Sequence, residues 1–249
     1  MPRGGQSLIE MLADVSTPGA PSIVVESTRP ADTKLGVKVA LLDIDAKIGF
    51  LPDMANRINR SQNYFHFEVV YIPVPSGYVR TDLDEHSQTF VPRLKDVLLG
   101  LPENLKVDFV CGLTQHMVAG ESGGQTFWNY FTALVSDNVT NVFVISTYDL
   151  RRYSLEAGEP FTRAVFGLCL AMLVLSDPRW KIDFHEETAG CLFDFCGNRD
   201  DIIFGLKKKS FDHKQCRAKI KDPALLAAID AFYTLDFSTD DRDHTDVAG

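Results

Sequence analysis

Three cysteines and one histidine near the carboxyl end are the feature that most limits how this chain can fold. They have the spacing Cys191-x4-Cys196-x16-His213-x2-Cys216, which is two close pairs separated by a loop. A tetrahedral zinc ion needs four such donors at about 2.0–2.3 Å, and two short pairs supply two donors from each of two turns. We therefore predict one structural zinc ion per chain, held by these four residues in a zinc knuckle over residues 185–220.

A glycine follows the second cysteine of this cluster. We expect Gly197 to provide the turn of the knuckle, because glycine adopts backbone conformations that other residues avoid. The loop from 198 to 211 is polar and rich in lysine, so metal binding is expected to supply much of its folding energy. Four protein ligands leave no open position on the ion, and the predicted zinc is therefore not catalytic.

The composition limits the compartment and the partners. The chain has five cysteines, an odd number, which in a reducing compartment favours metal ligation over disulfides. It has no apolar stretch of about 18 residues and no apolar segment typical of a secretory signal, so we predict a cytoplasmic protein with no membrane partner. The 34 acidic and 25 basic side chains give a net charge of -9, which argues against a nucleic-acid partner.

Strand and helix patterns alternate through the middle of the chain. Apolar, β-branched runs predict strands, and apolar residues at helical spacing predict helices. The strands are expected at 38–45, 66–75, 106–114 and 141–150, and the helices at 48–61, 90–101, 160–176 and 222–234. Residues 126–135 fit either element. This alternation predicts the α/β class, with a mixed sheet flanked by helices.

The two ends differ from this central domain. We predict an N-terminal extension and linker over residues 1–36, one α/β domain over 37–235, and a disordered acidic tail over 236–249. The tail is nearly devoid of large apolar residues, so it cannot offset the entropy lost on ordering. Within the domain, Asp222 ahead of Pro223 is typical of a helix N-cap.

The segment from about 141 to 220 resembles the archaemetzincins, a group of metzincin-like zinc metallopeptidases. In that family a strand and a long active-site helix lead to an HExxHxxGxxH motif, which is followed by C-x4-C and, after a loop, by C-x2-C. The strand VFVISTYDL, the apolar helix at 160–176 and the four-ligand knuckle occur here in the same order. His213 stands where the third cysteine would be. The resemblance implies a metzincin-like fold with a C-terminal zinc knuckle.

The peptidase motif of that family is missing from this chain. No HExxH occurs, and residues 180–190 (WKIDFHEETAG), which occupy the length of the motif, contain one histidine instead of three. A catalytic zinc needs three protein ligands and one open position, with a glutamate as general base. The dipeptide His185-Glu186 is all that corresponds to the first two residues of the motif.

Two functions are consistent with this pattern. The one we favour is a catalytically degenerate metzincin-like protein that keeps a structural zinc and acts as a binding, sensing or regulatory module for a protein partner or a small ligand. The alternative is a divergent zinc-dependent hydrolase or peptidase that uses His185 and Glu186, with a further ligand such as His116. In the first case His185 and Glu186 are ordinary polar residues. The oligomeric state is left open by the sequence.

Overall fold

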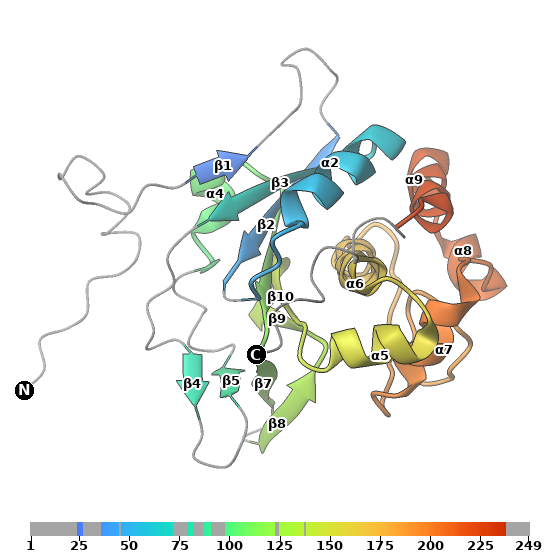
Figure 1. The fold of residues 1–249 in the computed structure, drawn as a ribbon. Helices are drawn as coiled ribbons and strands as arrows, with labels where there is room; N and C mark the ends of the chain where they lie inside the picture. Colours follow the sequence, from blue (N-terminus) through green and yellow to red (C-terminus); the bar gives the residue numbers. More distant parts are fainter. Residues whose placement is uncertain are drawn as a thin grey trace, which may run out of the picture.

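The computed structural model describes most of the chain between Val24 and Phe237. The described residues are 24–26, 36–44, 46–71, 79–81, 87–90, 98–122, 125–136 and 138–237. The strands and helices within them form two sheets and a set of helices concentrated in the C-terminal half (Figure 1).

The main sheet has six strands in the order β1-β3-β2-β6-β10-β9. The inner strands β3, β2, β6 and β10 are parallel, and the outer strands β1 and β9 pair antiparallel with β3 and β10, so the sheet is mixed as predicted. The strands are β1 (Val24–Glu26), β2 (Val37–Asp43), β3 (Phe65–Tyr71), β6 (Phe109–Thr114), β9 (Thr132–Ser136) and β10 (Val139–Ser146).

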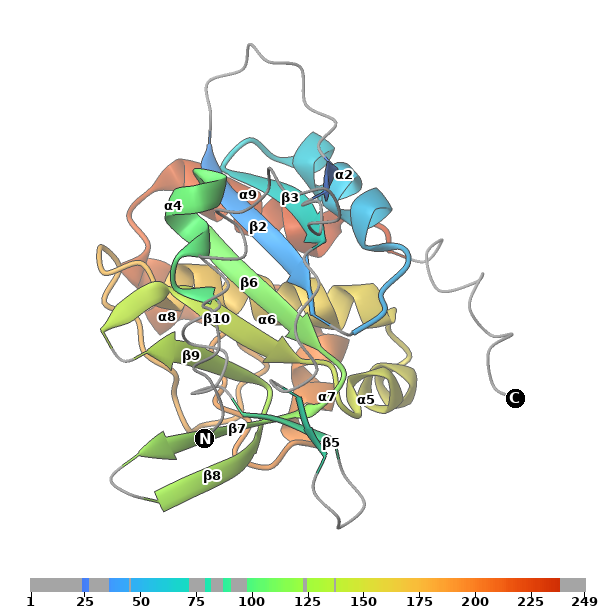
Figure 2. The ribbon, with the colours of Figure 1, turned by 90° about the vertical axis from the view of Figure 1, so that its left-hand side faces the viewer.

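Helices cover the two faces of this sheet unequally. One face packs against the long apolar helix α6 (Phe161–Leu175), with α2 (Leu51–Ser61) and α9 (Pro223–Thr234) beside it. The other face carries a smaller cluster that includes the short helix α4 (Leu101–Leu105). Figure 2 shows α4 in front of the sheet and α6 and α9 behind it. Because inner strands are buried on both faces, they appear in the sequence as nearly continuous apolar runs.

Helix α6 is buried on almost every side. Twelve of its fifteen residues are buried, and they include Thr162 and Arg163 as well as the apolar ones. A helix that is apolar all round is expected in the middle of a domain. The prediction of a buried helix at 160–176 is therefore confirmed.

The remaining elements are short. A second sheet has the order β4-β5-β7-β8, in which β5 and β7 are parallel. Three further helices, α5, α7 and α8, are also short, and α5 packs against α7. Their bounds are β4 (Val79–Thr81), β5 (Ser87–Phe90), β7 (Met117–Ser122), β8 (Gln125–Tyr130), α5 (Leu150–Ala157), α7 (Asp201–Lys208) and α8 (Lys214–Lys219).

The four predicted strands correspond to β2, β3, β6 and β10, and the last helix corresponds to α9. The strand expected at 141–150 ends earlier, at Ser146, and Leu150 begins α5, while residues 72–75 of the strand expected at 66–75 lie outside the described part. Residues 126–135, which fitted either element, belong to β8 and β9. Asp222 caps α9, since its carboxylate accepts hydrogen bonds from the backbone N–H groups of Ala224 (2.8 Å) and Leu225 (3.4 Å). Of the helix expected at 90–101, residue 90 instead ends strand β5, and residues 91–97 lie outside the described part. Leu98 is helical and α4 begins at Leu101, so most of this prediction stays untested.

The packed part of the structure also extends beyond both ends of the domain predicted over residues 37–235. Residues 24–26, placed in a linker, form strand β1, while 1–23 and 27–35 lie outside the described residues. Phe237, placed in the acidic tail, is 1% exposed and packs against Phe232 with ring centroids 5.4 Å apart. The packed body therefore continues past residue 235, and the predicted disorder of 238–249 falls outside the described residues.

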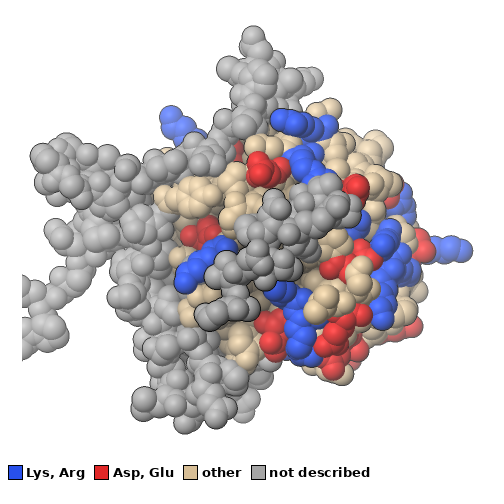
Figure 3. All heavy atoms as spheres, in the orientation of Figure 1, with Lys and Arg blue, Asp and Glu red and all other residues tan. Residues whose placement is uncertain are grey.

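Two further features concern the charged side chains on the surface and the length of the helices. Over the helical side of the molecule in Figure 3, lysines and arginines alternate with aspartates and glutamates. Within the described part of the chain, no single helix is long and apolar enough to cross a membrane. Helices α5 and α6 reach that length only together, and they meet at 113°.

Candidate metal centre

His185 is held beside the knuckle by a short backbone ladder. It lies after α6, in a segment with no regular helix or strand, and forms an isolated parallel bridge with Asp194. The backbone N–H of His185 donates to the carbonyl of Phe193 (3.1 Å), and the N–H of Phe195 donates to the carbonyl of His185 (2.9 Å). This ladder is a contact across the loop, so the spacing of the cysteines alone does not indicate it.

The turn between His185 and the first cysteine depends on Gly190. Its φ is +69°, and a Cβ atom at this position would lie 2.6 Å from Cδ of Lys208. The N–H of Gly190 donates to Oδ2 of Asp194 at 2.8 Å, which closes the turn. The expectation that Gly197 provides the special conformation is wrong, because the residue with positive φ there is Cys196 itself (52°).

The second half of the centre comes from helix α8. His213 is the N-cap residue of α8, and Cys216 lies in its first turn, with Nδ1 of His213 3.1 Å from Sγ of Cys216. Arg217 fixes this helix, since it donates to both carboxylate oxygens of Asp230 on α9 (2.7 and 2.6 Å) and to the carbonyl of Phe211 (2.9 Å). The two donors of α8 are therefore anchored to the C-terminal helix.

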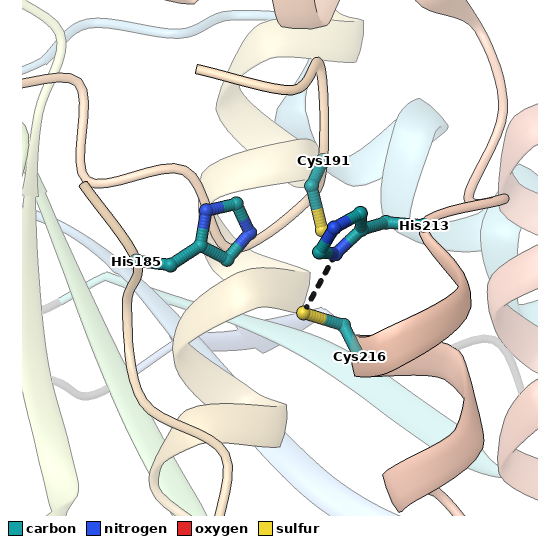
Figure 4. A group of neighbouring side chains, drawn as sticks. All are labelled: His185, Cys191, His213 and Cys216. Atoms are coloured by element: carbon teal, nitrogen blue, oxygen red, sulfur yellow. Dashed lines mark hydrogen bonds between the residues drawn. The ribbon is translucent and has the colours of Figure 1, made fainter. Parts of the chain in front are cut away.

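Four side chains from these two halves converge on one point. One donor atom from each of His185, Cys191, His213 and Cys216 lies within 4.8 Å of the other three. Figure 4 shows the four side chains pointing toward a common region, with His185 on the left, Cys191 above, His213 on the right and Cys216 below. Ligands of a tetrahedral zinc ion are roughly 3.3–3.8 Å apart, given zinc–sulfur and zinc–nitrogen distances of about 2.3 and 2.0–2.1 Å. Small side-chain rotations would close the group around an ion.

Cys196, the remaining predicted ligand, is not part of this group. The structure brings three of the four predicted ligands together and places His185 in the fourth position. The thiol of Cys196 is largely enclosed, and burial raises its pKa to about 12, with Asp194 and Asp201 adding to the effect. Its side chain lines an apolar cavity with Leu192 and Ile202.

The ring of His185 is oriented as a metal-binding imidazole would be. Nδ1 lies 2.8 Å from the carbonyl oxygen of Glu187 and donates a hydrogen bond to it, which leaves Nε2 as the ring nitrogen available to a metal ion. Nε2 is buried, lies 3.5 Å from Oδ1 of Asp194, and makes no hydrogen bond with any described residue. Metal-binding histidines commonly donate their other N–H to a carbonyl or a carboxylate in this way.

The thiols of the group are shielded from water. Burial raises the pKa of Cys191 to about 12, and burial also raises the pKa of Cys216. Both are therefore protonated at neutral pH unless a cation is present. Since the thiolate is the form that binds metal, an ion entering this group must displace their protons.

The other candidates for catalysis do not join the group. Glu186 is exposed, next to His185 in the chain, and is not among the converging donors. His116 lies in the turn between β6 and β7 and is also outside the group.

Comparisons with protein-family models and with curated proteins found no match. Among solved structures, archaemetzincin from Methanopyrus kandleri aligns with 74% of this chain and 93% of its own, with a TM-score of 0.50 at 15% identity. This chain has the archaemetzincin fold. A zinc-dependent peptidase from Methanocorpusculum labreanum aligns with 73% of this chain and 98% of its own, with a TM-score of 0.44 at 11% identity.

Proposed function

We propose that this protein is a metzincin-fold binding module stabilised by one structural zinc ion, bound by His185, Cys191, His213 and Cys216. The observation that carries the proposal is the convergence of four donor atoms, all within 4.8 Å of one another, from two separate turns of the chain. The assignment keeps three of the ligands expected from the sequence and replaces Cys196 by His185.

The donor types select zinc. Two thiolates and two imidazoles in a tetrahedral arrangement form a Cys2His2 site, which suits zinc better than the hard cations that prefer oxygen. Two thiolates also balance the charge of the divalent ion itself. A cytoplasmic location, which we retain as a proposal, keeps these thiols reduced.

The same four donors argue against the hydrolase alternative. A catalytic zinc keeps one position open for water, whereas four protein ligands fill a tetrahedral ion. His185, the only histidine in the region of the missing motif, is used as a ligand in this arrangement. Glu186 is then an exposed glutamate with no metal-bound water to activate.

Zinc would join two parts of the fold. His185 and Cys191 belong to the segment that follows α6, whereas His213 and Cys216 belong to α8, which is fixed to α9 through Arg217 and Asp230. Binding of the ion would therefore tie the loop after the buried helix to the C-terminal helices, and the binding free energy would contribute directly to folding. The partner is a protein or a small ligand rather than nucleic acid, since the net charge is -9.

Metal analysis of the purified chain tests the proposal. We expect one zinc per chain by plasma mass spectrometry, and a visible spectrum typical of four-coordinate cobalt with thiolate ligands when Co²⁺ replaces zinc. The spectrum should not change when a small anion is added, because no position is open. A chain without bound metal, or a cobalt spectrum that responds to added anions, would contradict the proposal.

A further inference from the structure

A cleft beside the zinc group is lined mainly by apolar side chains. Its volume is about 250 Å³, and it lies between α6, strand β9 and the two irregular segments joined by the His185–Asp194 bridge. The lining side chains used below are Phe131, Leu168, Phe184, Leu192, Phe195 and Arg199. We call this set the aromatic cleft.

Two phenylalanines at the aromatic cleft are left open to solvent. Phe184 is 39% exposed and Phe195 is 52% exposed, and their rings pack edge to face with centroids 6.2 Å apart. Only two other large apolar side chains of the described residues are comparably exposed, Leu155 and Phe204. Scattered exposed residues need no explanation, but an exposed aromatic pair at the mouth of an apolar cleft is typical of an interaction site.

The inner part of the aromatic cleft is fixed in place. The guanidinium of Arg199 lies 3.8 Å from the ring centroid of Phe131 and donates a hydrogen bond to the carbonyl of Tyr148 at 2.7 Å. Burial lowers the pKa of Arg199, but the group stays charged at neutral pH because arginine starts so high. A preorganised cleft loses little conformational entropy when a partner binds.

The chain around the aromatic cleft is strongly acidic. Residues 183–201 contain one basic side chain, Arg199, and six carboxylates, which are Asp183, Glu186, Glu187, Asp194, Asp200 and Asp201. Asp183 and Glu186 are exposed on either side of Phe184 and His185, and Asp200 is exposed next to Arg199. A zinc ion with two thiolates adds no positive charge to this balance.

We infer that the aromatic cleft is a docking site for a basic segment of a partner protein. An apolar side chain of that segment enters the cleft between Phe131 and Leu192. The flanking lysines or arginines lie against the exposed rings of Phe184 and Phe195, where cation–π attraction applies, and near the carboxylates. The inference rests on the proposed function, because the zinc ligand His185 is adjacent to Phe184 and Cys191 is adjacent to Leu192.

Fluorescence anisotropy with three labelled heptapeptides tests this inference. The probe is GKLKLKG, and its two controls are GELELEG, which reverses the charge, and GKAKAKG, which removes the apolar anchors. The protein is the full chain, with Phe195→Ala as the variant. Phe204→Ala is the matched control, since Phe204 is equally exposed (52%) but does not line the cleft.

We expect GKLKLKG to bind at least about tenfold more tightly than either control peptide, and Phe195→Ala to weaken it about tenfold while Phe204→Ala does not. Binding should also weaken as salt is raised from low to physiological concentration. Equal binding of GELELEG, or equal loss in the two phenylalanine variants, would overturn the inference. Zinc content measured on the same samples separates the two proposals, because a chain that holds one zinc and binds none of the peptides contradicts only this one.

Discussion

The centroids of the imidazole rings of His185 and His213 lie 4.9 Å apart, and the planes of the rings are inclined at 42°. One ring belongs to the irregular segment after α6 and the other to the start of α8, so their proximity is a tertiary contact. Cys191 and Cys216 complete the group. A site of two imidazoles and two thiolates follows from this contact, whereas the cysteine spacing alone indicates three thiolates and one imidazole.

Gly190 is the turn residue whose replacement should be least tolerated. Gly190→Ala places a methyl group 2.6 Å from Lys208 and 3.1 Å from Phe204, at a φ of +69°. We expect a loss of about 1–3 kcal/mol in the free energy of unfolding, measured by chemical denaturation.

Gly158→Ala is the matched control for that substitution. Gly158 has a similar φ of +71°, but nothing lies within 4 Å of a Cβ atom there. Gly158→Ala should therefore lower the free energy of unfolding only through backbone strain, by about 1 kcal/mol. If the two variants were equally stable, the close packing at Gly190 would not matter.

Sequence patterns were sufficient to predict the strands and helices that have long apolar runs. The strands around 38–45, 106–114 and 141–150 and the helix at 160–176 are buried on several sides, so their composition is nearly uniform and easily recognised. Shorter elements such as α7 and α8 carry few buried residues each. Their local signals are too short to distinguish them from loops, and the segment 198–211 was accordingly expected to be a loop.

The candidate centre was only partly predictable for a related reason. Cys191, His213 and Cys216 were found because ligand type and close spacing are local properties. The position of His185 depends on its backbone ladder with Phe193 and Phe195, which no spacing rule indicates. The turn at Gly190 likewise depends on a tertiary contact, because Lys208 of helix α7 packs against it.

Phe237 should contribute to stability even though it lies at the start of an acidic tail. Its ring packs on Phe232 and under the guanidinium of Arg163, 4.8 Å from the ring centroid. The carbonyl of Leu235 accepts from Arg163 at 3.1 Å, and the carbonyl of Asp236 accepts from Arg57. We expect Phe237→Ala to lower the free energy of unfolding by about 3–5 kcal/mol in urea denaturation.

A pair of truncations provides the control for this prediction. Ending the chain after Phe237 keeps every one of these contacts, so its urea midpoint should match that of the full chain. Ending it after Leu235 removes Phe237 and should reproduce most of the loss. Equal midpoints for both truncations would show that Phe237 is not an anchor.

The ion pair of Asp177 and Arg179 should make stability depend on acid pH. Burial alone would raise the pKa of Asp177, but hydrogen bonds and charge from Arg179 outweigh it and lower the pKa. A lowered pKa in the folded state means that the pair stabilises the fold above about pH 4 and that this contribution is lost as pH falls below it. Because Arg179 is more than half exposed, we expect less than about 1 kcal/mol.

Denaturation of the parent and Asp177→Asn at pH 7 and pH 3 checks this effect. The parent should lose more stability on acidification than the variant, in which the side chain cannot titrate. Arg179→Met should reduce the pH dependence in the same direction. Identical pH dependence in the parent and both variants would rule out the ion pair as its source.

The zinc content of His185→Ala measured beside Cys196→Ser tests the central claim most directly. Both residues lie in the same short segment, but only His185 belongs to the converging group. We predict about one zinc per chain in the parent and in Cys196→Ser, and substantial loss of zinc from His185→Ala, because removing one of four ligands weakens the site. Full zinc in His185→Ala together with its loss from Cys196→Ser would contradict the assignment.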